Sequence, residues 1–148
     1  MGVDRSHPGW KLLNDALVRL ATKSHALSAT VMDEGYAVWG EANAEGVIRE
    51  PLLEQVERFY RVEIEPRISE MRHGVAVGMQ NLTGPDYYVA QSFASIYVAI
   101  LWYGGTFDVF SAHEALRAAL PEIEAITLSL PPWDGPDAGS GAGAKRYA

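Results

Sequence analysis

Residues 95–105 read SIYVAILWYGG, and the part from Ile96 to Tyr103 is the longest apolar run in the chain. Successive side chains of a strand point to opposite faces, so a strand that is apolar at every position has two buried faces. The run is too short for a membrane-spanning helix, which needs about 20 residues. The pattern therefore predicts a central strand over 95–103, in a sheet covered on both sides, that ends at Gly104 and Gly105.

Four more strands are predicted earlier in the chain. Segments 75–80 and 87–92 are rich in apolar residues, the loop NLTGPD separates them, and a turn at Phe93 and Ala94 leads into the central strand. Segments 26–32 and 36–39 flank Asp33-Glu34-Gly35, which is a typical turn sequence. This second pair is interpreted as a β-hairpin, followed by a polar loop over 40–46.

Amphipathic helices are predicted before, between and after the strands. Over 8–24, apolar residues recur at helical spacing, and Pro8 suits a first helical position. Over 50–65, a broad apolar face is opposed by Glu and Arg residues, and Pro66 is expected to end or kink this helix. The last helix is expected over 112–120, with Ser111 and Glu114 as a capping box.

Pro121 is expected to kink this last helix or to start a second segment that reaches Leu130. The alternation over 126–130 also fits a strand, and helix is the preferred interpretation. The fold class is therefore α/β of the α+β kind, with a five-stranded, mostly antiparallel sheet between helices, in the order α-β-β-α-β-β-β-α. We expect one domain over 1–130 and a flexible C-terminal tail over 131–148, which is rich in Pro, Gly and Ala.

Composition excludes several classes of function. The chain has 148 residues, a formal net charge of -7 and no cysteine, which excludes disulfides, thiolate nucleophiles and most structural zinc sites. The acidic balance, without a cluster of Lys and Arg, disfavours binding to nucleic acid or to an anionic membrane surface. The N-terminal segment has no apolar signal core, so we expect a cytoplasmic protein without membrane insertion.

Catalytic signatures are missing from the sequence. It contains no phosphate-binding loop, no GxGxxG and no GxSxG nucleophile elbow. No two of the four histidines (His7, His25, His73 and His113) lie within metal-ligand spacing of each other. We therefore expect no enzymatic activity, no cofactor and no metal, and a protein that works by binding other proteins.

Aromatic residues are densest over 87–103, where they could line a pocket for a small molecule. The alternative function is thus a ligand-sensing domain of the PAS or GAF type, although aromatics on paired strands more commonly pack a core. A cavity lined by Tyr88, Tyr97 and Trp102 would favour this alternative. A dry sheet covered on both faces would remove it.

The predicted strand over 75–80 has the character of an unprotected edge. It begins Val75-Ala76-Val77-Gly78-Met79 and contains neither Lys nor Pro, the residues that protect edges from pairing. An exposed edge of this kind invites another strand. If two copies of one edge pair with each other, the result is a closed two-fold dimer.

Three segments together resemble the roadblock/dynein light chain family. They are the first helix running into the hairpin ALSATVMDEGYAVWGEA, the strand pair YYVAQSFASIYVAILWYGG, and the closing segment SAHEALRAALPEIEAITLSLPP. The resemblance spans roughly Trp10 to Leu130. It implies a roadblock-like (profilin-like) fold, in which a five-stranded sheet lies between helices.

The resemblance also implies a homodimer, in which the middle helix and the strand after it pair with their copies. The interface would then contain Leu52, Val56, Phe59, Tyr60, Val75, Val77 and Met79. Bacterial members of the family are often partners of small Ras-like GTPases, which they stimulate to hydrolyse GTP or hold at a cell pole. This chain would accordingly be a non-catalytic adaptor or regulator in bacterial signalling. Its candidate partner-binding residues are Arg58, Arg61, Arg67 and Arg72, for each of which surface ion pairing is the competing use.

Overall fold

The computed structural model describes residues 8–35, 38–43 and 52–131, without the side chains of 38–43, Leu52 and Leu53. The predicted tail, apart from residue 131, lies outside this part of the chain. The elements are α1 (Pro8–Ser24), β1 (Ser28–Asp33), β2 (Val38–Asn43), α2 (Leu52–Phe59), the π-helix η1 (Tyr60–Ile64), the 3-10 helix η2 (Glu65–Arg67), α3 (Ile68–Arg72), β3 (Gly78–Asn81), β4 (Tyr87–Phe93), β5 (Tyr97–Tyr103) and α4 (Val109–Ser129).

The strands form one antiparallel sheet in the order β2-β1-β5-β4-β3, with β5 in the middle. All seven residues of β5 are buried, so the predicted central strand is confirmed. β2 continues to Asn43, where a loop was expected, because backbone pairing with β1 does not require apolar side chains. The mixed α/β class is likewise confirmed.

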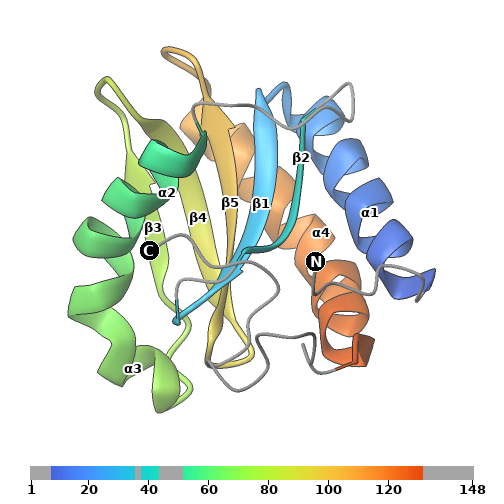
Figure 1. Ribbon diagram of the computed structural model, residues 1–148. Coiled ribbons are helices and arrows are strands. Elements are labelled where there is room, and N and C mark those ends of the chain that lie inside the picture. Colours follow the sequence, from blue (N-terminus) through green and yellow to red (C-terminus); the bar gives the residue numbers. More distant parts are fainter. Residues whose placement is uncertain (1–7, 36–37, 44–51, 132–148) are drawn as a thin grey trace.

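The two faces of the sheet carry separate cores, as the alternation of side chains along a strand requires. Val98, Ile100 and Trp102 of β5 pack with α2 and α3, whereas Ala99 and Leu101 pack with α1 and α4. Figure 1 shows α2 and α3 on one side of the sheet and α1 and α4 on the other. Helices therefore cover both faces of β5.

The predicted middle helix does not end before Pro66. Helical turns continue from α2 through η1 and η2 into α3 and end at Arg72. Pro66 has no N–H for the ladder of hydrogen bonds, and the wide π turn and tight 3-10 turn occur where that ladder is disturbed. The result is one bent helical arm that lies along the sheet beside β3.

The last helix begins three residues earlier than predicted. Asp108, not Ser111, is its N-cap, because the Asp108 carboxylate accepts a hydrogen bond from the Ser111 N–H at 3.2 Å. Pro121 neither splits the helix nor turns 126–130 into a strand. Its ring lies on the exposed side of a single helix, where the interrupted hydrogen bond is open to solvent.

Candidate partner-binding surface

The first component of the candidate surface is the outer edge of β3, with which no described strand pairs. The Ser92 N–H donates to the Val77 carbonyl at 2.9 Å, which fixes the phase of the β3–β4 ladder. Backbone groups alternate in direction along an antiparallel strand, so Met79 and Asn81 also pair with β4. Gly78 and Gln80 therefore direct their N–H and C=O groups away from the sheet. This edge has hydrogen-bonding groups for another strand.

Exposed aliphatic side chains accompany this edge. Val75 precedes β3 and is 52% exposed, Leu82 follows it and is 45% exposed, and Val62 of η1 is 61% exposed. Val62 and Asn81 line the same pocket of about 190 Å³ between η1 and the end of β3. A partner strand at β3 would cover apolar surface as well as backbone, a combination typical of interfaces.

A buried hydrogen-bond network fixes η1 to the sheet beside this edge. The Glu63 carboxylate, 8% exposed, accepts bonds from the Tyr88 hydroxyl at 2.5 Å and from Arg67 at 3.0 Å. Burial, and then the bond to Glu63, raise the pKa of Tyr88, so its hydroxyl stays protonated and remains a donor. Glu63 is thus a buried carboxylate with both a neutral and a cationic donor, which is what its burial requires.

A second ion pair holds the loop between β3 and β4. The Arg58 guanidinium donates to both oxygens of Asp86, at 2.5 and 2.8 Å, and hydrogen bonding to Asp86 raises the pKa of Arg58 above its ordinary value. The Asn81 amide donates to the Asp86 carbonyl at 2.6 Å. The helical arm and the end of β3 are therefore tied together, and the edge is presented on a well-supported platform.

The opposite side of β3 contacts α4. Gln80 Oε1 lies 2.8 Å from His113 Nε2, so the edge strand is linked to both helical layers. Burial, and then the charge of Arg117, lower the pKa of His113, which favours the neutral ring. Neutral His113 with its proton on Nε2 donates to Gln80.

Three of the predicted dimer-interface residues belong instead to the chain's own core. Val56, Phe59 and Met79 are at most 4% exposed and pack against the sheet. The resemblance to the roadblock family implies that Val56 and Phe59 lie in a dimer seam, but the sheet itself covers them. Tyr60 and Val77 are partly buried, Val75 is exposed, and the side chain of Leu52 lies outside the described residues.

Three of the four candidate arginines form ion pairs. Arg58 pairs with Asp86, Arg67 with Glu63, and Arg72 with Glu34 at 2.6 Å, which ties α3 to the end of β1. Arg61 is exposed and makes no ion pair with any described residue. Of the four candidate arginines, Arg61 is therefore the one whose guanidinium is available, within the described structure, for an ion pair with another protein.

Sequence reasoning missed Val62 and the Glu63–Tyr88 contact. Val62 stands between Arg61 and Glu63, and an aliphatic residue in a polar stretch was the available signal. In the sequence, Glu63 resembles an ordinary solvated surface residue, because the π turn that rotates it inward has no signature there. The pairing with Tyr88 joins residues 25 positions apart, which only the fold brings together.

The aromatic residues proposed for a ligand pocket do not surround one. Tyr88 and Trp102 pack edge-to-face with each other and with Phe59 on the α2 side of the sheet. Tyr97 stacks on Phe93 in the core formed with α1 and α4. The three residues named for a common cavity are therefore packed in two cores on opposite faces, which removes the observation that would support a ligand-sensing domain.

Two further kinds of feature are absent from the described residues. Among them, no group of three or more His, Asp or Glu side chains could hold a metal ion. No helix in that part of the chain is both long and apolar enough to cross a bilayer.

The fold matches solved structures of gliding proteins. MglB from Thermus thermophilus superposes with a TM-score of 0.65 over 87% of this chain and 97% of that one, and Myxococcus xanthus MglB with 0.60 over 88% and 97%. A further structure, described as MglB with tetrameric arrangement, superposes with 0.60 over 84% and 93%. The sequence identity is 11% in each case, so the likeness shows the fold alone. No protein-family model and no curated protein sequence matches the chain. MglB is a roadblock-domain protein, and the predicted roadblock-like fold is confirmed.

Proposed function

We propose that this chain, with the fold of MglB, is a non-catalytic homodimer that binds and regulates a small Ras-like GTPase in the cytoplasm. The observation that carries the proposal is the open, apolar-flanked edge of β3 in a roadblock-like fold. The resemblance of the sequence to bacterial roadblock proteins supports the choice of partner. The tetrameric arrangement described for one MglB supports self-association within this fold.

The dimer that we propose joins two β3 strands in antiparallel fashion. Gly78 and Gln80 both direct backbone groups outward, so pairing Gly78 with Gln80 of a second copy satisfies all of these groups about a two-fold axis at Met79. Because glycine has no side chain, this register also avoids two Gln side chains facing each other. Val62, Val75 and Leu82 lie beside the seam, where the second copy would cover them.

The GTPase-binding surface that we propose includes Arg61 on η1, adjacent to Val62 and hence to the seam. Hydrolysis by a Ras-like GTPase depends on residues that position the attacking water, many of them in the GTPase itself. A regulator can therefore act by binding and ordering those residues without a catalytic group of its own. An exposed cation suits this task because it can pair with acidic residues or phosphate oxygens.

The proposal is tested by measuring GTP hydrolysis and co-elution with a Ras-like GTPase encoded beside this chain. We expect the wild-type protein to co-elute with the GTP-bound form and to change the hydrolysis rate. Arg61→Ala should weaken binding by about fivefold to tenfold, the loss expected for a cation that pairs with a charged group across an interface.

The matched control is Lys11→Ala, which removes an exposed cation from α1, on the other side of the sheet. This variant should bind the GTPase like the wild type. Absence of both binding and rate change with the wild-type protein, with a GTPase shown to bind GTP, would contradict the proposed function.

A further inference from the structure

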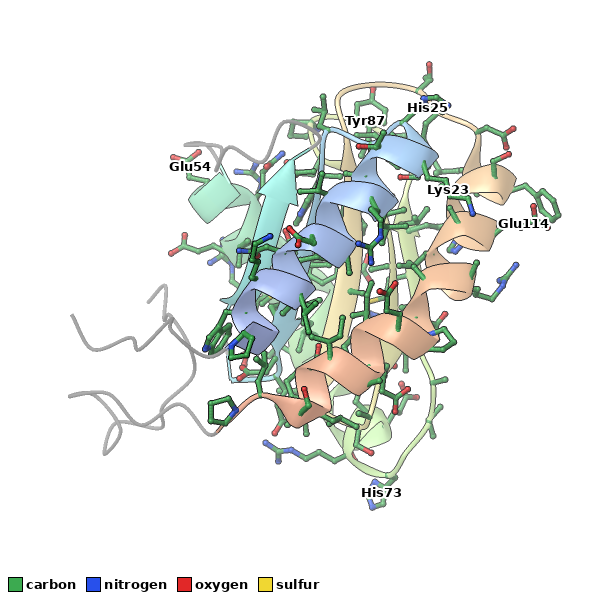
Figure 2. All side chains as sticks on the ribbon, turned by 90° about the vertical axis from the view of Figure 1, so that its right-hand side faces the viewer. Lys23, His25, Glu54, His73, Tyr87 and Glu114 are labelled. Carbon is green, nitrogen blue, oxygen red and sulfur yellow. The ribbon has the colours of Figure 1, made fainter. Side chains whose placement is uncertain are left out.

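Helices α1 and α4 together form a face, on the side of the sheet opposite α2, that no other described element covers. They lie side by side and run in opposite directions, as Figure 2 shows. Arg19 and Glu122 pair across them at 2.5 Å, and a groove of about 280 Å³ runs between them. Four alanines, Ala16, Ala115, Ala118 and Ala119, line this groove together with Leu20, Lys23 and the Arg19–Glu122 pair.

The outer side of α4 is unusually apolar for a helix face that no described element covers. Residues at helical spacing along it are Phe110, Glu114, Ala118, Pro121, Ala125 and Leu128, all exposed and only one of them charged. Phe110 is 67% exposed and Leu128 is 57% exposed. A helix that covers a core normally shows charged and polar residues on its outer side. On α1, Leu12 adds a further aliphatic residue that is 55% exposed.

The two helices carry opposite net charges. α1 has three cationic residues and one acidic residue (Lys11, Arg19, Lys23 and Asp15), whereas α4 has three acidic residues and one cationic residue (Glu114, Glu122, Glu124 and Arg117). Lys23 and Glu114, labelled in Figure 2, lie at the same end of the face, and neither forms an ion pair with a described residue.

We infer that this face binds the same face of a second copy of the chain. A two-fold axis along the groove would place α1 of one copy over α4 of the other, in an antiparallel four-helix bundle. Lys23 lines the groove beside Ala115, so it would face Glu114 of the second copy. At the opposite end, Leu12 would face Leu128, because the helices are antiparallel. A surface that is basic on one helix and acidic on the other thus becomes self-complementary.

The dimensions of the face indicate the strength of this contact. At 1.5 Å per residue, α1 is about 25 Å long, and two helices about 10 Å wide give a face of roughly 500 Å². A stable interface of standard size buries about 800 Å² of each partner, so the bundle should form reversibly with rising concentration. The contact is separate from the β3 edge, and a chain that uses both assembles beyond a dimer.

The test is sedimentation equilibrium of the full chain over a range of concentrations. The wild type should exceed the mass of a dimer as concentration rises, whereas Ala118→Glu should stop at the dimer, because it places a charge in the seam of the bundle. The matched control is Asn14→Glu, which adds the same charge to α1. Asn14 is nine residues, or about two and a half turns, from Lys23, so it lies on the opposite side of the helix, away from the groove. Ala118 and Asn14 are both exposed, so neither change disturbs the core.

Charge exchange tests the geometry of the bundle. Lys23→Glu or Glu114→Lys alone should weaken this association roughly tenfold, since like charges then meet across the seam. The double variant should restore it. A merely structural role for either residue would not give such a rescue.

The outcomes separate this inference from the proposed function. If β3 does not pair, the wild type should be a dimer that Ala118→Glu converts to a monomer. That result would support the helix bundle and contradict the proposed β3 dimer. If Ala118→Glu and Leu128→Glu both leave the masses unchanged, the inference is overturned. The same holds if they abolish binding to the GTPase while leaving the masses unchanged, because the face would then bind that partner.

Discussion

Trp102→Ala should cost about 3–5 kcal/mol of unfolding free energy, the range for removing a large aromatic side chain from a core. Trp102 lies on the central strand and is fully buried. Its ring meets Phe59 at 5.8 Å and Tyr88 at 5.6 Å between centroids, both edge-to-face. The substitution leaves a cavity between sheet and α2 and removes the donor to Thr30. Because domains of this size are stable by about 5–15 kcal/mol, the substitution would remove a fifth or more of the stability.

Urea denaturation followed by far-UV circular dichroism measures this loss. Trp102→Phe keeps an aromatic ring in the core but loses part of the packing volume and the bond from Nε1 to Thr30 Oγ1, which is 3.0 Å long, so its cost should be clearly smaller than that of Trp102→Ala. Thr22→Ala, on the exposed surface of α1, should change the midpoint little. A Trp102→Ala midpoint within error of the wild type would show that this side chain is not at the centre of the fold.

Gln80→Pro should abolish pairing through β3 and leave the chain folded. The Gln80 N–H points away from β4, so its loss removes no hydrogen bond inside the sheet, and proline is tolerated on an edge strand at such a position. In the β3 dimer, in contrast, each copy loses the N–H that residue 80 would donate across the seam. The proline ring of one copy would also meet the strand of the other. We expect the dissociation constant of the β3 dimer to rise on the order of 100-fold.

This effect is measured by sedimentation equilibrium in the Ala118→Glu background, where only the β3 contact remains. Gln80→Ala is the matched control, because it removes the side-chain contact with His113 and keeps the backbone N–H. It should dimerise nearly as well as its parent. Equal dimerisation by Gln80→Pro and Gln80→Ala would place the interface away from this edge.

The central strand could be predicted because its pattern leaves little choice. A run that is apolar at every position from 96 to 103 is compatible with one environment, a strand with both faces covered, and β5 occupies it. The apolar segment 87–92, now part of β4, and the helical spacing in α1 were equally direct. These features depend on side-chain periodicity, which the sequence states explicitly.

The candidate surface was less predictable, because periodicity does not say what covers an apolar face. The face of α2 that contains Val56 and Phe59 was assigned to a partner, whereas the chain's own sheet covers it. The π turn that buries Glu63 and exposes Val62 is a response to tertiary packing and to Pro66, and it has no local signature. The N-cap is Asp108 and not Ser111 for a simpler reason. Both residue types suit the N-cap position, and packing in the folded chain determines at which of them the helix begins.

Backbone hydrogen exchange at Gly78 and Gln80 tests the β3 pairing most directly. In a single chain both N–H groups point away from the sheet, so they would exchange rapidly. In the paired edge they are hydrogen-bonded to a second copy and should exchange slowly at concentrations where the chain is associated, as Met79 does through β4. Rapid exchange at Gly78 and Gln80 in the associated protein would contradict the proposed dimer.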